Sequence, residues 1–477
     1  MTRDVVPRFV IELPSCTTAC TQRALVEDET QSVYSFVVPR DRLCSSDDLP
    51  LHTLLIHVPQ STETALIIRA IDTLRCEKVQ DEWYRHLPAY VGHTQALDLS
   101  IKAIVAACAY GRGVPKVTAH DCYEALAVAL DAVQADIKQS RGKPSDDMLA
   151  STALLAPFEG AIKKNGISTC LHIEGLAAIL AARPATSPVT PLAREILDFH
   201  ACESTIMACI QGTPSPFESI APVYFANTRM GCSDSDRAQL KAIGTELFIR
   251  IPRLVKLVRL LRLQSPPQNQ LLFEALRLSK SLLRLQDSQT EGRLLRSIEI
   301  RPSSDLNALS SLGQSLHFAS VKDFEALVCY WQNRLSLLRL EWRLHDLSMC
   351  GGVQADTTDG LGGSFRPSFG PKTDEIFRLL KNILMCSEYA GTLALRKHDH
   401  LFAHAMVAVW GVTMDVPVAL SPDQDGEETD ALRDLLLRRV SIALAAKPDL
   451  TFHDMDAAAD LFAGGQPKGR LAELYGL

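Results

Sequence analysis

The stretch WYRHLPAYVGHTQALDLSIKAIVAACAYGRG at residues 83–113 decides how this chain is organised. From Thr94 onward, apolar residues recur in steps of three and four, which places them on one face of a helix. The residues of this face are Leu97, Ile101, Ile104, Val105 and Cys108. The glycines of the closing GRG end the pattern, as is common at helix C-termini. We expect an amphipathic helix that buries Ile101 and exposes Lys102.

Three further amphipathic segments follow this stretch. They read YEALAVALDAVQADI at 123–137, DDMLASTALLAPFEG at 146–160 and LHIEGLAAILAARPA at 171–185. Short polar side chains accept hydrogen bonds from the unpaired amides of a first helical turn. We therefore expect Asp121 to cap the first of these helices and Ser145 the second. Short connections favour antiparallel neighbours, so the fold class is all-α, a large array of antiparallel helical hairpins.

The rest of the chain adds an appendage and more helices. Residues 1–47 contain the β-prone runs FVIEL and SVYSFVVP, so we expect a small, partly extended N-terminal leader. Residues 48–477 are expected to form the helical body. Its further helices are predicted at 49–78, 237–263, 321–348, 372–416, 432–446 and 454–465. The glycine-rich run at 351–371 lacks the Lys-Ser/Thr ending of a phosphate loop and is expected to be a connection.

The ordered set of helices resembles a known family, the fungal-specific transcription factor domain, which is the regulatory domain of fungal Zn2Cys6 transcription factors. The resemblance is carried by Trp83 with LPAY, by YEALAVALDAVQ, by DDMLASTALLAPFEG, and by His172 and Gly175 followed by LAAILAARP. The later segment LFIRIPRLVKLVRLL is also similar to segments of that family. After the fourth helix, however, this chain has Ala182, Arg183 and Pro184 in place of the RGP of the family. The resemblance implies an all-α regulatory body located in the nucleus or cytoplasm.

The cysteines and the net charge bear on nucleic-acid binding. A binuclear zinc cluster needs six thiolates in closely spaced CxxC pairs. The 13 cysteines here are scattered, and the nearest approach to such a pair is CTTAC at Cys16 and Cys20. A net charge of −7 argues against a broad phosphate-binding surface. We expect no metal, no cofactor and no direct nucleic acid. No apolar run approaches the roughly 20 residues of a membrane helix, so no membrane association is expected.

One leucine-rich stretch carries a regular row of basic residues. Arg253, Lys256, Arg259 and Arg262 recur every three residues beside an apolar face. This pattern is typical of a helix that binds a membrane surface or a partner. It is more often seen in an internal helix whose basic side is solvated or paired with acidic residues. We expect the internal helix here and keep the membrane-surface or partner-binding helix as the alternative.

Two clusters of ionisable residues are candidates for chemistry. His400 and His404 lie four apart in KHDHLFAH, so both imidazoles fit one helix face, as in a metal site. However, Leu401 occupies the position of the glutamate in HExxH. Glu341 and His345 are also four apart, a spacing that orients an imidazole for general base catalysis. Structural histidines and an intrahelical pair explain the same patterns.

The leading functional hypothesis is a transcription-factor-like regulatory protein without its own DNA-binding module. Such a protein acts through a small hydrophobic effector, or through a protein partner or a second copy of itself. The alternative is an enzyme that cyclises or isomerises a hydrophobic metabolite in a helical pocket, with Glu341, His345, His400 and His404 as its catalytic candidates. A pocket with two or more convergent ionisable groups of shifted pKa would favour the enzyme.

Overall fold

The computed structural model describes most of the chain after residue 81. The described residues are 82–140, 143–163, 169–183, 189–227, 235–264, 268–303, 313–350, 370–393, 399–415, 436–438 and 451–469. The chain divides into Met1–Thr62 and Glu63–Leu477, and everything below concerns the second unit. The predicted leader, the helix predicted at 49–78 and nearly all of the glycine-rich connection lie outside the described residues.

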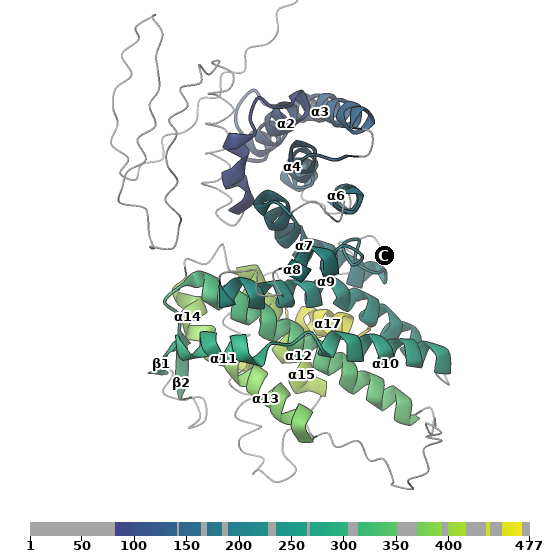
Figure 1. The fold of residues 1–477 in the computed structure, drawn as a ribbon, viewed down its shortest axis with the longest axis vertical. Coiled ribbons are helices and arrows are strands. Elements are labelled where there is room, and N and C mark those ends of the chain that lie inside the picture. Colours follow the sequence, from purple (N-terminus) through teal and green to yellow (C-terminus); the bar gives the residue numbers. More distant parts are fainter. Residues whose placement is uncertain are drawn as a thin grey trace, which may run out of the picture. The chain divides into compact units, whose positions relative to one another are not determined.

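The predicted all-α fold class is confirmed (Figure 1). The first part of the body contains η2 (Glu82–Ala89), α2 (Gln95–Gly111), α3 (Ala119–Gln139), α4 (Asp146–Leu155), α5 (Phe158–Lys163), α6 (Thr169–Ala182), α7 (Pro191–Gln211) and α8 (Ala221–Asn227). The second part contains α9 (Asp236–Arg262), α10 (Asn269–Leu283), α11 (Ser288–Arg296), α12 (Val321–Cys350), α13 (Gly370–Met385), α14 (Ser387–Thr392), α15 (Asp399–Asp415) and α17 (Phe452–Phe462). Of the helix predicted at 432–446, only residues 436–438 are described, and they are helical.

A small sheet interrupts the helical body where no strand was predicted. β1 (Glu299–Pro302) pairs antiparallel with β2 (Gln314–His317), so that Ile300 lies opposite Leu316. Leu316 is buried and Ile300 is exposed. The pair is four residues long on each side, which is too short for a clear alternating pattern in the sequence.

The helix caps show how local sequence sets the boundaries. Ser145 caps α4 as predicted, since its side chain accepts from the amide of Met148. The prediction for α3 was wrong by three residues, because Thr118 rather than Asp121 is the N-cap. Asp121 instead closes a capping box, in which its carboxylate accepts from the Thr118 amide at 2.9 Å.

The face predicted for the first array helix is correct at Leu97, Ile101 and Ile104, which are buried in α2, whereas Val105 and Cys108 are only half-buried. Lys102 is exposed, as expected.

The apolar residues of α3 are buried near the middle of the helix, at Leu126 and Val133, whereas Ile137 at the C-terminal end is 44% exposed.

Two hydrophobic cores fill the body, and two helices belong to both. The first core lies among η2 and α2–α8, and the second lies among α9–α17 and the sheet. On α9, Ala242 and Ile249 belong to the first core, whereas Leu240, Ile243, Leu247, Ile251 and Leu254 belong to the second. On α7, the N-terminal part packs in the first core, and Cys209 and Ile210 pack in the second. The two cores are therefore continuous through α7 and α9.

Three of the four residues in the basic row of α9 bind groups within the same body. Arg253 forms ion pairs with Glu218 and Glu274, and Arg262 forms one with Asp460 at 2.8 Å. Arg259 is buried and donates to backbone carbonyls of α7. This pairing favours the interpretation of α9 as an internal helix over a membrane-binding or partner-binding one.

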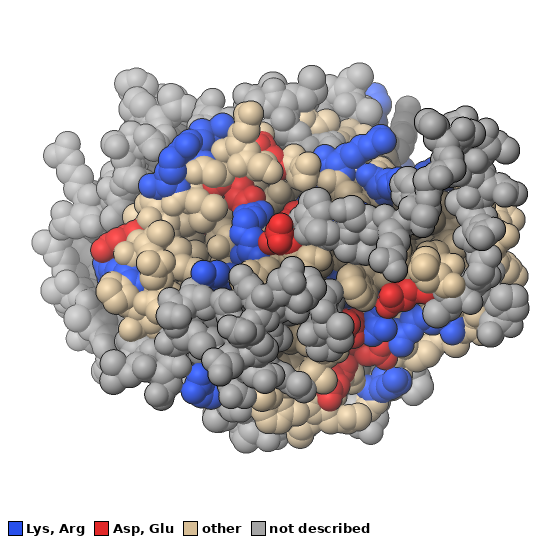
Figure 2. Space-filling view, turned by 90° about the horizontal axis from the view of Figure 1, so that it is seen from below, with Lys and Arg blue, Asp and Glu red and all other residues tan. Residues whose placement is uncertain are grey.

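The surface and the helix lengths bear on the expected partners. On the face shown in Figure 2, basic and acidic side chains of the described residues lie next to one another. Opposite charges at close range cancel much of each other's field, which weakens attraction for a polyanion. Within the described part of the chain, no helix is both long and apolar enough to cross a bilayer.

Candidate functional site

The candidate site begins at a proline inside α9. Pro252 has no amide hydrogen, so it cannot donate to the carbonyl of Phe248 one turn earlier. Thr205 on α7 takes that role, because its Oγ1 donates to the Phe248 carbonyl at 3.1 Å. Ile251 and Phe248, which flank this interruption, both line a cavity.

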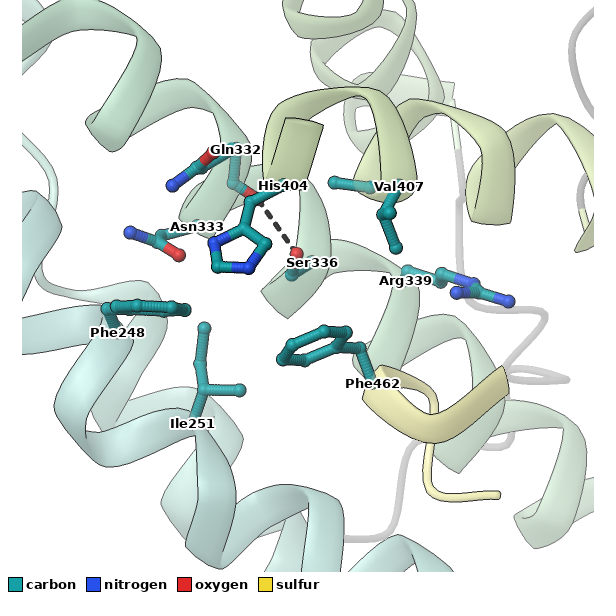
Figure 3. A pocket seen from close by; sticks show the side chains of 10 residues that line it. Phe248, Ile251, Gln332, Asn333, Ser336, Arg339, His404, Val407 and Phe462 are labelled. Carbon is teal, nitrogen blue, oxygen red and sulfur yellow. Dashed lines mark hydrogen bonds between the residues drawn. The ribbon is translucent and has the colours of Figure 1, made fainter. Parts of the chain in front are cut away.

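The cavity is formed by α9, α12, α15 and α17 (Figure 3). Five of its ten lining residues are apolar and five are polar. The lining residues are Phe248, Ile251, Gln332, Asn333, Ser336, Arg339, His404, Val407, Ala408 and Phe462. The cavity is partly open, and its volume is about 20 Å³. That volume accommodates one water-sized group rather than a whole metabolite.

Asn333 on α12 turns its amide oxygen into the cavity. Its Nδ2 donates to the carbonyls of Gly244 at 3.0 Å and Cys329 at 2.8 Å. These two bonds use both amide hydrogens and so fix the orientation of the amide. Figure 3 shows Oδ1 on the side of the His404 ring and Nδ2 on the far side. None of the hydrogen bonds found among the described residues involves this Oδ1.

Arg339 brings a positive charge to the cavity wall. Its Nε donates to Asp415 at 2.6 Å, and its Nη1 donates to the carbonyl of Ala459 on α17. Arg343 binds the same carboxylate, also at 2.6 Å, so two guanidinium groups share one acid. Burial lowers the pKa of Arg339, while the Asp415 carboxylate acts in the opposite direction. The guanidinium lies directly against Gly411 of α15, where a side chain would collide with it.

His404 on α15 is the sequence-predicted residue that the structure places in the cavity. Its ring centroid lies 6.0 Å from that of Phe248 and 6.2 Å from that of Phe462. Its Nδ1 lies 3.6 Å from Sγ of Cys202 on α7. Burial raises the pKa of Cys202 to about 12, so the thiol keeps its proton at neutral pH. The thiol and the imidazole can therefore share a hydrogen bond, in which the donor depends on the tautomer of the ring.

The other predicted site residues do not line the cavity. Glu341 forms an ion pair with Lys372 on α13, and its partner in the proposed pair, His345, is half-buried. His400 belongs to α15, but its side chain lies outside the described residues. Among the described residues, no group of three His, Cys, Asp or Glu side chains is arranged to hold a metal ion.

The chemistry of the cavity suits recognition better than nucleophilic attack. Burial raises the pKa of Cys329 to about 12, as it does for Cys202, so neither thiol is ionised at neutral pH. The thiolate, not the thiol, is the reactive form of cysteine. What the cavity offers instead is an amide acceptor and two phenyl rings, with the guanidinium of Arg339 turned away from them.

Sequence reasoning missed most of these residues, although one signal was present. Gln332, Asn333, Ser336 and Arg339 lie on one side of α12, within a run that is apolar apart from these residues and Arg334. Gln332, Asn333 and Arg339 are buried. Buried polar side chains in such a run need partners, and this points to a site or a polar contact.

Comparisons with protein-family models, with curated proteins and with solved structures found no match to this chain.

Proposed function

We propose that this chain is a transcription-factor-like regulatory protein that acts through binding of an effector or a protein partner. The ordered resemblance of its first helices to the fungal transcription factor domain supports this proposal. Its cysteines lack zinc-cluster spacing, so we propose that a partner protein, rather than this chain, contacts the DNA.

The observation that carries the proposal is the position of α9. One helix contributes to both cores, and its Pro252 interruption adjoins the cavity. Regulation requires that an event at one site alters packing at another. A ligand beside Phe248 and Ile251 would act on a helix whose opposite side packs in the first core. Ile249, fully buried there, is the nearest such contact in the sequence.

A tethering experiment tests the regulatory proposal. The full chain is fused to an unrelated DNA-binding domain and expressed with a reporter that carries the matching sites. We expect reporter transcription to rise or fall clearly relative to the DNA-binding domain alone. Ile249→Asp, which places a charge in the first core, should abolish the effect, while Lys102→Ala on the exposed face of α2 should preserve it. Reporter levels that equal those of the DNA-binding domain alone would contradict the proposal.

The second candidate function is an enzyme, and the location of His404 in the cavity favours it. Here the protein is incubated with metabolites of its own pathway, and the assay is repeated with His345→Ala, His400→Ala and His404→Ala. Loss of a positioned acid or base typically lowers the rate by about 10²–10⁴. Turnover that only His404→Ala abolishes, in a folded variant, would establish catalysis in the cavity. Turnover unaffected by all three variants would place the chemistry elsewhere.

A further inference from the structure

The strongest unassigned feature is the acceptor inside the cavity. Asn333 is 98% buried, with 2% of its surface exposed, and Oδ1 faces the cavity. A molecule that covers this oxygen without donating to it removes the oxygen from water and loses a hydrogen bond. Any molecule that enters is therefore selected for a hydrogen-bond donor at this point.

The charged groups near the cavity bear on which hydrogen-bond donor it accepts, a neutral hydroxyl or a charged ammonium group. Arg339 and Arg343 share the single carboxylate of Asp415, so this cluster carries a net positive charge. Arg339 lines the cavity and is buried, and Figure 3 shows its guanidinium turned away from Asn333. The described lining residues include no carboxylate that could pair with an ammonium group, and burying an unpaired ammonium costs far more than burying a hydroxyl. The donor that fits is thus an uncharged hydroxyl rather than a protonated amine.

The size and the walls define the remainder of the ligand. Room for one water-sized group admits a hydroxyl head but not a ring. Phe248, Ile251 and Phe462 provide apolar surface around it. An apolar body attached to the hydroxyl would lie against these side chains at the open part of the cavity.

We propose that the cavity binds the hydroxyl group of a small uncharged apolar alcohol, which donates to Asn333 Oδ1 while its apolar body contacts Phe248 and Phe462. The proposal rests on the proposed function, since it specifies the chemistry of the effector. Its test is a direct binding measurement and does not depend on transcription.

The experiment is isothermal titration of the purified full chain with three probes of similar size at neutral pH. Benzyl alcohol should bind. Toluene, which lacks the donor, should bind about tenfold more weakly, because it leaves Oδ1 unpaired. Benzylamine, protonated at this pH, should bind more weakly than toluene. Equal affinity for the three probes would overturn the proposal. Absence of binding by all three would also overturn it and leave water as the occupant.

A matched pair of variants assigns the binding to this cavity. Val407 lines the cavity and is half-buried, and Val407→Ile adds one methylene group, which is about the size of the space available. Ala403 lies on the exposed side of the same helix, and Ala403→Ile places the same side chain there. We expect benzyl alcohol binding to be lost in the first variant and kept in the second. Binding retained in Val407→Ile would place the alcohol elsewhere and overturn the assignment. Binding without a reporter response would refute only the regulatory proposal.

Discussion

Oγ1 of Thr205 donates to the carbonyl oxygen of Phe248 at 3.1 Å, and this carbonyl is the one that Pro252 leaves without its helical donor. A residue on α7 thus completes the hydrogen bonding of α9. Thr205 is fully buried, so water cannot replace it. The contact joins the two helices that the cores share.

The first prediction concerns this bond. Thr205→Val keeps the shape of the side chain but leaves the Phe248 carbonyl unsatisfied, which should lower the free energy of unfolding by about 1–3 kcal/mol. In a Pro252→Ala background the new amide hydrogen can serve the carbonyl, so the same change should cost less. Denaturant unfolding of the four proteins measures the difference. An equal cost in both backgrounds would show that the proline does not create the need for Thr205.

The second prediction concerns Gly411. A Cβ at this position would lie 2.0 Å from Nη1 of Arg339, so Gly411→Ala must displace the guanidinium from Asp415 and from α17. We expect a loss of about 1–3 kcal/mol in unfolding free energy, and more if the ion pair breaks. Gly391 in α14 has no atom near its Cβ position, and Gly391→Ala should be neutral or slightly stabilising. Comparable losses in thermal unfolding of the two variants would contradict this account.

The third prediction tests the phase of the first array helix. Ile101→Ala removes a fully buried side chain from the first core and should cost roughly 2–5 kcal/mol. Lys102→Ala lies on the exposed face and should cost less than about 0.5 kcal/mol. Both values come from chemical denaturation at neutral pH. The prediction fails if the two substitutions are equally destabilising.

The fourth prediction is a pH dependence that arises from Asp198 on α7. Burial raises the pKa of this carboxyl, against the opposing effect of Lys241 at 3.7 Å. Because its pKa is raised in the folded state, the protonated carboxyl of Asp198 favours folding. This contribution to the free energy of unfolding is fully present below the unfolded pKa of about 3.9 and is lost as pH rises through the folded pKa. Relative to Asp198→Asn, the native protein should therefore lose stability as the pH is raised above about 4. Unfolding midpoints at several pH values measure this difference.

Asp236 provides the control of opposite sign. The hydrogen bond from Arg293 lowers the pKa of its carboxyl. The contribution of Asp236 to the free energy of unfolding should be present above the unfolded pKa and be lost as pH falls through the folded pKa. If Asp198→Asn and Asp236→Asn shift the pH profile in the same direction, the assigned cause for Asp198 is wrong.

The fifth prediction concerns DNA. The cysteines lack zinc-cluster spacing and the net charge is −7, so the purified chain should not bind duplex DNA selectively. A fluorescence or gel-shift titration at physiological salt, with a panel of duplexes, measures this. Sequence-selective binding at nanomolar concentration would refute the prediction.

The features that the sequence predicted well are local ones. The cap of α4 and the buried face of α2 depend on residues within one or two turns, so Ser145 and Ile101 were placed correctly. The α3 boundary was displaced because Asp121 was assigned as the N-cap. In a capping box the first residue, Thr118, is the N-cap, and the acid three positions later, Asp121, accepts from its backbone amide.

The features that the sequence did not reveal depend on long-range contacts. Each strand of the β1–β2 pair is too short to show an alternating pattern in the sequence. The pair is stabilised by strand pairing and by the burial of Leu316. The cavity combines four helices that are distant in the chain. His404 was singled out for its spacing from His400, but Cys202, whose Sγ lies 3.6 Å from its Nδ1, is 202 residues away in the chain. Such a partner has no trace in local periodicity.

The participation of α9 in both cores has a consequence during synthesis on the ribosome. The helices from η2 to α8 emerge first, but their core contains Ala242 and Ile249, which are made later. Until α9 has left the exit tunnel, apolar surface on these helices has no permanent cover. The nascent chain is therefore exposed to chaperones and proteases during this interval, and a stop codon before residue 235 would yield a product that never leaves that state.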